Sequence, residues 1–166
     1  MTAKGYIFNG YQLNLKEGNL ITREGLMYTH ILYATDLSED HFDLCKKAAE
    51  IAKCFNAKLY LLHVIEPPGS LQLAQGLGFA EFYRPMKDDA ETVMRTLGEA
   101  LNIPTQQQFV EIGSIKTHVL NKVTELSCNL IILGSHTPST LPSFLGSTAH
   151  AVVNHATCDV LTLRAH

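Results

Sequence analysis

The stretch GSHTPSTLPSFLGS, from Gly134 to Ser147, has features of a loop that binds an anion through backbone N–H groups. A glycine follows a short apolar run, and a Gly-Ser pair begins the next helical pattern. In this arrangement the backbone N–H groups of the loop and of the helix start can point toward a phosphate. Thr137, Pro138 and Pro142 depart from it, because a β-branched residue before proline favours extended geometry and proline has no N–H to donate. The pattern therefore predicts half of a phosphate cradle.

Other residues of catalytic type give weaker signals. The sequence contains neither a GxxxxGK[ST] phosphate loop nor a GxSxG nucleophile elbow. Ser135 and His136 are adjacent, and neighbours in a loop rarely align as nucleophile and base. His150 and His155 are five residues apart and do not share a helix face, as metal ligands would. His63 lies in an apolar run and is predicted to be a core histidine with its hydrogen bonds satisfied. We expect no catalytic residues and no metal site.

Length, charge and composition exclude several classes of protein for this chain. A chain of 166 residues predicts one domain with a sizeable core, and a net charge of −3 offers no basic surface to nucleic acid or anionic membranes. The longest apolar runs, such as Leu59 to Ile65, are too short to cross a bilayer, and no secretion signal is evident. The widely spaced cysteines fit small reduced core residues: Cys45, Cys54, Cys128 and Cys158. We expect a cytoplasmic protein that binds neither nucleic acid nor membrane.

Strand and helix patterns alternate from Thr29 onward, which is typical of βαβ units. The apolar runs lack polar alternation, as expected where both faces of a parallel sheet are covered. The predicted strands are 30–37, 57–65, 105–112, 129–133 and 159–163, and the predicted helices are 38–55, 90–101, 115–126 and 147–155. The pattern predicts an α/β fold with a mostly parallel sheet and helices on both faces.

Two segments fall outside this alternation. The connection 66–87 is rich in proline, glycine and aromatic residues, and long connections of this kind are functional, partner-facing or mobile. The first 26 residues carry an Asn9-Gly10 hairpin signal, although an isolated hairpin is marginal in water, and Met27 is an alternative start. We interpret residues 1–27 as an N-terminal extension, hairpin-like or disordered, and residues 28–166 as the domain.

Taken in order, HILYATDLSED, AKLYLLHV, LIILGSH and GSTAHAVVNHATCDVLTLR resemble the universal stress protein family. The resemblance covers Tyr28 to Arg164. It implies a five-stranded, parallel, open twisted sheet of the Rossmann-like type, in a cytoplasmic homodimer made during stress or growth arrest. One branch of this family binds ATP, and another lacks the phosphate loop and does not.

The same resemblance implies a nucleotide site at the carboxyl ends of the strands, where open α/β sheets bind ligands. Asp36 would face the ribose hydroxyls or a phosphate-bound metal, and Val64 would offer backbone groups to adenine. Gly134 would let the chain pass close to the phosphates. Donors to the phosphates would come from Gly146, Ser147 and Thr148. Each residue also has a purely structural explanation as a turn or helix-start residue; their joint order favours the site.

The chain departs from the ATP-binding pattern, which has a second glycine three residues after the first and then nine residues before Gly-Ser or Gly-Thr. Thr137 stands at the position of the second glycine, and only eight residues separate Thr137 from Gly146. We therefore predict a non-enzymatic universal stress protein with at most weak nucleotide binding and no required cofactor. The alternative is an ATP-binding switch or slow ATPase that uses ATP with magnesium in the same pocket. A third hypothesis is a scaffold recruited through the segment from Phe79 to Tyr83.

The last predicted strand, DVLTLR, bears on the assembly. It alternates apolar and polar residues and would lie at the edge of the sheet, and an unpaired edge invites another chain. The family resemblance implies the same two-fold pairing. We expect a homodimer through this strand, and the sequence does not identify other protein partners.

Overall fold

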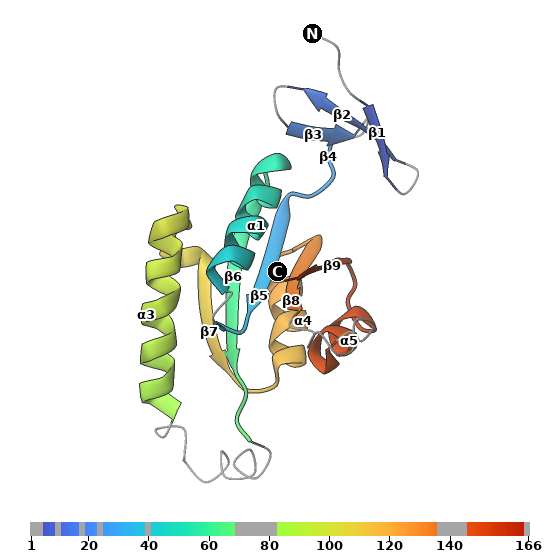
Figure 1. Ribbon diagram of the computed structural model, residues 1–166. Coiled ribbons are helices and arrows are strands. Elements are labelled where there is room, and N and C mark those ends of the chain that lie inside the picture. The colour runs from blue at the N-terminus through green and yellow to red at the C-terminus, as the bar shows by residue number, and fades with distance from the viewer. Residues whose placement is uncertain are drawn as a thin grey trace.

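The domain is built on a parallel sheet whose strand order is β7-β6-β5-β8-β9 (Figure 1). The computed structural model describes residues 5–8, 11–16, 19–22, 25–38, 41–68, 83–135 and 146–164. Every neighbouring pair in this sheet is parallel. The strands are β5 (His30–Thr35), β6 (Lys58–Ile65), β7 (Gln108–Ile112), β8 (Leu130–Ser135) and β9 (Asp159–Arg164). The predicted α/β class and the five-stranded parallel sheet are confirmed.

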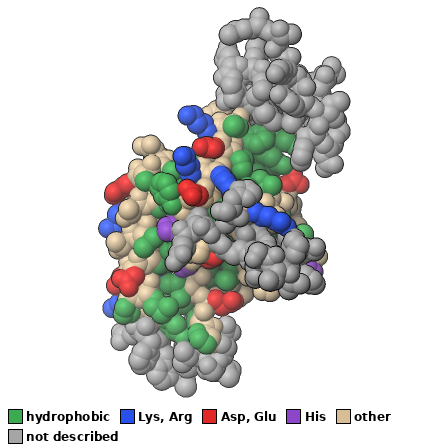
Figure 2. Space-filling model, viewed as in Figure 1, with side chains coloured by type: hydrophobic (Ala, Val, Ile, Leu, Met, Phe, Trp, Pro, Cys, Tyr) green, Lys and Arg blue, Asp and Glu red, His purple; other side chains and the backbone are tan. Residues whose placement is uncertain are grey.

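Helices cover both faces of the sheet. They are α1 (His41–Cys54), α3 (Arg84–Leu101), α4 (Ile115–Glu125) and α5 (Ser147–Val153). Helices α1 and α3 pack on one face, and α4 and α5 pack on the other. Figure 2 shows acidic and basic side chains interspersed on the face in view. Among the described residues, none of the helices is both long and apolar enough to cross a membrane.

Side chains of the central strands alternate between the two cores. In β5, Ile31 and Tyr33 pack with the residues of α1 and α3, whereas Leu32 packs with those of α4 and α5. This follows from the period of two along a strand. Both faces are buried, which explains why the central strands read as continuous apolar runs rather than as alternating ones.

The direction in which successive strands are added to the sheet reverses at β5. From β5 the chain adds β6 and then β7 on one side, and it then crosses back to place β8 and β9 on the other side. Ligands of open α/β sheets bind outside the carboxyl ends of the strands at such a reversal. The topology therefore directs attention to the ends of β5, β6 and β8.

Some element boundaries differ from the prediction. The segment 105–112 begins with a 3₁₀ turn, Thr105–Gln107, after Pro104, so the strand is shorter than expected. Helix α3 begins at Arg84, inside the connection predicted for 66–87. In the predicted helix 38–55, the helical spacing of apolar residues favours a buried Phe42, but Phe42 is 44% exposed and Leu44 occupies the core. These differences lie at element ends, where packing rather than periodicity decides.

The N-terminal residues form a separate antiparallel sheet of order β1-β2-β3-β4. Its strands are β1 (Gly5–Phe8), β2 (Tyr11–Lys16), β3 (Asn19–Thr22) and β4 (Gly25–Leu26). Phe8 pairs with Tyr11 across the predicted Asn9-Gly10 turn, which itself lies outside the described residues. The hairpin therefore extends into two further short strands. The division into an extension, 1–27, and a domain, 28–166, stays a prediction.

The start of β5 is held by the side chain of Asn129. Its Oδ1 accepts hydrogen bonds from the backbone N–H groups of Thr29, at 3.1 Å, and His30, at 3.2 Å. Its Nδ2 donates to the carbonyl of Met27 at 3.4 Å. One amide side chain thus satisfies the backbone where the chain enters the sheet.

Tyr28 makes a second attachment at the same place. Its hydroxyl donates to Asp159 Oδ2 at 2.8 Å, and its ring meets Phe55 edge-on with centroids 4.9 Å apart. Burial, together with the bond to Asp159, raises the pKa of Tyr28 to about 12. The chain is therefore anchored to β9 and to the segment after α1 from residue 28 onward.

Candidate functional site

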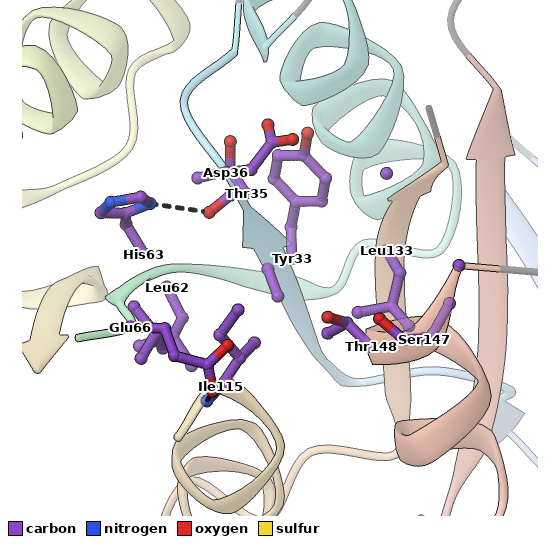
Figure 3. A pocket seen from close by; sticks show the side chains of 15 residues that line it. Tyr33, Thr35, Asp36, Leu62, His63, Glu66, Ile115, Leu133, Ser147 and Thr148 are labelled. Atoms are coloured by element: carbon purple, nitrogen blue, oxygen red, sulfur yellow. Dashed lines mark hydrogen bonds between the residues drawn. The ribbon is translucent and has the colours of Figure 1, made fainter. Parts of the chain in front are cut away.

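A pocket of about 360 Å³ opens at the carboxyl ends of β5, β6 and β8 (Figure 3). Its volume lies within the range of small-ligand sites. All six residues of the predicted nucleotide site line it: Asp36, Val64, Gly134, Gly146, Ser147 and Thr148. Tyr33, Ala34, Thr35, Leu62, His63, Glu66, Ile115, Leu133 and Ala149 complete the lining. Segments far apart in the chain therefore meet where the strand-order reversal directs a ligand.

The end of β5 turns sharply at the pocket. Leu37 has a φ of 56°, a left-handed conformation that costs a branched residue on the order of 1–3 kcal/mol. Two polar side chains hold this turn: Thr35 Oγ1 accepts from Leu37 N at 3.2 Å, and Asp36 Oδ1 accepts from Ser38 N at 3.0 Å. The second bond fixes the direction of the Asp36 carboxylate, which is exposed to solvent at the pocket.

The end of β6 contributes a histidine that the sequence interpretation placed in the core. His63 is half-buried and lines the pocket, so that interpretation was wrong about its position. It was right about a satisfied ring nitrogen, because Nδ1 donates to the carbonyl of Thr35 at 2.9 Å (Figure 3). This tautomer leaves Nε2 as an acceptor. His63 lies near the end of β6, where the strand borders the pocket and is no longer covered by helices.

Glu66 follows β6 and reaches the start of α4. Its Oε1 accepts a hydrogen bond from the backbone N–H of Ile115 at 3.4 Å, and both residues line the pocket. Neither residue was predicted to belong to the site. A usable signal did exist, since polar residues directly after buried parallel strands gather at one edge of the sheet.

Close packing explains why position 134 is a glycine, and this explanation was not apparent from the sequence. A Cβ at this position would lie 3.2 Å from Leu44 Cδ1 and 4.0 Å from the hydroxyl oxygen of Tyr33. Leu44 and Tyr33 are each 1% exposed, so neither can swing into solvent. Glycine therefore allows α1 to approach β8 closely, whether or not a ligand binds.

Gly146 differs from Gly134, because its surroundings are open. Its φ of −56° and ψ of 155° are accessible to any residue, and no described atom lies within 4 Å of the place of a Cβ. Ser147 is exposed and Thr148 is half-buried at the pocket wall. The loop that contains Thr137, Pro138 and Pro142 lies outside the described residues, so its predicted loss of phosphate donors stays a prediction.

The described lining contains few ionisable side chains. Asp36 and Glu66 are carboxylates, and His63 is the histidine of the lining. Burial raises the pKa of Tyr33 far above its usual value, although a hydrogen bond with the Thr35 side chain opposes the shift. Tyr33 therefore stays a neutral phenol at any physiological pH. Within the described part of the chain, no group of three or more His, Cys, Asp and Glu side chains is placed to hold a metal ion.

Comparison with known proteins agrees with this architecture. A family model described as the universal stress protein family matches residues 27–164. Universal stress protein A homolog 1 of Coxiella burnetii is 33% identical over 141 residues, which cover 82% of this chain and 96% of that protein.

Solved structures match the fold at lower identity. The structure of the protein MJ0577 superposes with a TM-score of 0.65 at 23% identity, covering 84% of this chain and 98% of its own. A universal stress protein solved in complex with cAMP gives a TM-score of 0.53 at 20% identity, covering 82% of this chain and 97% of its own. Fold, family model and relatives agree, and the chain belongs to the universal stress protein family.

Proposed function

We propose that this protein is a non-enzymatic stress protein that binds a small nucleoside-containing ligand weakly in the pocket at the carboxyl ends of β5, β6 and β8. The observation that carries the proposal is the meeting of the six predicted residues around one pocket. They come from three strand ends and from the start of α5, and nothing local in the chain requires them to converge. The cAMP complex of a structural relative supports the same class of ligand.

Weak binding is proposed because of the loop between β8 and α5. Thr137 replaces a glycine, and Pro138 and Pro142 withhold two N–H groups. Losing two charge-assisted hydrogen bonds, at ~1.5–3 kcal/mol each, weakens binding by roughly a hundredfold or more. Binding without turnover fits a protein that responds to a ligand level.

Titration calorimetry with cAMP, and with ATP and magnesium, tests the proposal. We expect weak binding that Gly146→Ala reduces at least tenfold, because the new methyl group enters the pocket. The melting temperature of Gly146→Ala should stay within about 4 °C of that of the unaltered protein, since its backbone angles suit alanine. Absence of any heat of binding would overturn the proposal. Micromolar ATP binding with phosphate release would favour the switch or slow ATPase instead.

We also propose that two copies pair through β9 in the cytoplasm. β9 is an edge strand of the sheet, and its Leu161 is 36% exposed although apolar. An unpaired apolar edge is suited to pairing with a second chain. Sedimentation should show a dimer that Leu161→Lys converts to a monomer. Val93→Lys is the matched control, because Val93 is a similarly exposed apolar residue, 39%, on α3. A monomer before any substitution would show that the pairing is wrong.

A further inference from the structure

The charge of the pocket bears on the kind of ligand it accepts. Its described lining contains the carboxylates of Asp36 and Glu66 and neither lysine nor arginine. Basic residues are also missing from the neighbouring sequence, because no lysine or arginine occurs between Lys122 and Arg164. That range includes β8, α5 and the whole connection between them. Lys116 follows Ile115 on α4 but is not part of the lining. A phosphate here would meet two anions and no cation of the described lining.

Amides at the start of α4 are engaged by side chains of the protein itself. α4 has eleven residues and its first residue, Ile115, lines the pocket. The N–H of Ile115 is donated to Glu66 Oε1, and the N–H of Thr117 is donated to Ser114 Oγ at 3.5 Å. Helix N-termini attract anions through such amides. Two of the first amides of α4 are therefore already donated within the protein, and one of them is donated to a carboxylate that would repel a phosphate.

We infer that the pocket selects for the uncharged nucleoside part of its ligand and against phosphate charge, an inference that rests on the nucleoside-binding function proposed above. The carboxylates of Asp36 and Glu66 accept hydrogen bonds from hydroxyl and amino groups, which a nucleoside supplies and an ionised phosphate does not. Affinity should fall from adenosine to AMP to ATP. For an assumed separation of about 8 Å between carboxylate and phosphate, and an effective dielectric constant of about 40, between the values for water and a protein surface, repulsion lowers affinity roughly fivefold per charge pair.

Calorimetric titration with adenosine, AMP and ATP, each in EDTA and in magnesium, tests this order. Salt is the sharpest variable, because it screens repulsion: raising the ionic strength should strengthen ATP binding and leave adenosine binding unchanged. Glu66→Gln keeps an oxygen that can accept from Ile115 N and removes the charge. It should raise ATP affinity relative to adenosine affinity at least fivefold, because the triphosphate carries several charges and adenosine carries none.

Glu99→Gln is the matched control. Glu99 is exposed near the end of α3, which leads to the start of β7 and so to the opposite edge of the sheet from the pocket. This variant should leave both affinities unchanged. If ATP, with or without magnesium, binds more tightly than adenosine, or if salt weakens ATP binding, the charge selection is overturned while the proposed function stands. If none of the three ligands binds, the proposed function fails and the charge selection falls with it.

Discussion

Substituting alanine for Gly134 should destabilise the domain through a single contact. The new Cβ would lie 3.2 Å from Leu44 Cδ1, closer than ordinary van der Waals contact. Leu44 is 1% exposed, so it must shift against the core. Overpacking of this kind costs about 1–3 kcal/mol, and the stiffer unfolded chain returns about 0.4–1 kcal/mol. The net loss is about 0.5–2 kcal/mol, or a melting temperature roughly 2–6 °C lower.

Urea unfolding followed by circular dichroism measures this loss. The slope of the unfolding free energy against urea should not change, since the same surface is exposed. Gly146→Ala is the matched control and should change stability by less than about 1 kcal/mol, because its Cβ position is open. A double-mutant cycle with Leu44→Ala isolates the contact, since truncating Leu44 removes the carbon that the added methyl group would meet. An equal cost of Gly134→Ala with and without Leu44 would refute the steric account.

Three further outcomes follow from the structure. Removing residues 1–26 should leave cooperative thermal unfolding, because the hydrogen bonds of Met27 and Tyr28 to the domain remain. Loss of the transition would show that the extension is part of the core. Asn129→Ala should lower the unfolding free energy by about 1–3 kcal/mol, because two backbone N–H groups lose their acceptor, and an unchanged urea midpoint would contradict this. Iodoacetamide should label the exposed Cys54 in the folded protein and the buried Cys45 only after unfolding. Burial raises the pKa of Cys45 to about 12, so this thiol ionises first in the unfolded chain and the free energy of unfolding should fall above about pH 9. Burial raises the pKa of Cys128 to about 12 as well, so Cys45→Ala should reduce the slope by about 1.4 kcal/mol per pH unit without abolishing it.

Much of the fold is readable in the sequence because it depends on local pattern. The apolar runs at Ile31 and Leu61 lack alternation, and each is buried by helices on both faces. The Gly146-Ser147 pair marks where α5 begins. The Asn9-Gly10 pair likewise predicts two strands that pair across it, as β1 and β2 do. These features need only a residue and its near neighbours in the chain.

The site is readable only in part. Asp36 and Gly146 stand at strand and helix ends, so their positions follow from the order of elements and the family resemblance. The hydrogen bond from His63 to Thr35 joins residues that are 28 positions apart, and the hydrogen bond from Ile115 to Glu66 joins residues that are 49 positions apart. No local sequence pattern predicts either bond. They exist because β6 lies beside β5, and because α4 begins beside the end of β6.

Strand order is the step that the sequence leaves undetermined and the tertiary structure decides. The chain visits β5, β6, β7, β8 and β9 in turn, yet β8 pairs with β5 and not with β7. That choice puts Gly134 beside Tyr33 and against Leu44, where the packing of α1 explains a glycine that the sequence analysis assigned to a phosphate site or a turn. It also brings Gly134 and the start of α5 to the pocket that Asp36 and Glu66 line, and the described lining of this pocket holds neither lysine nor arginine. Residue type determines what each group can do, whereas burial of both sheet faces decides which groups meet.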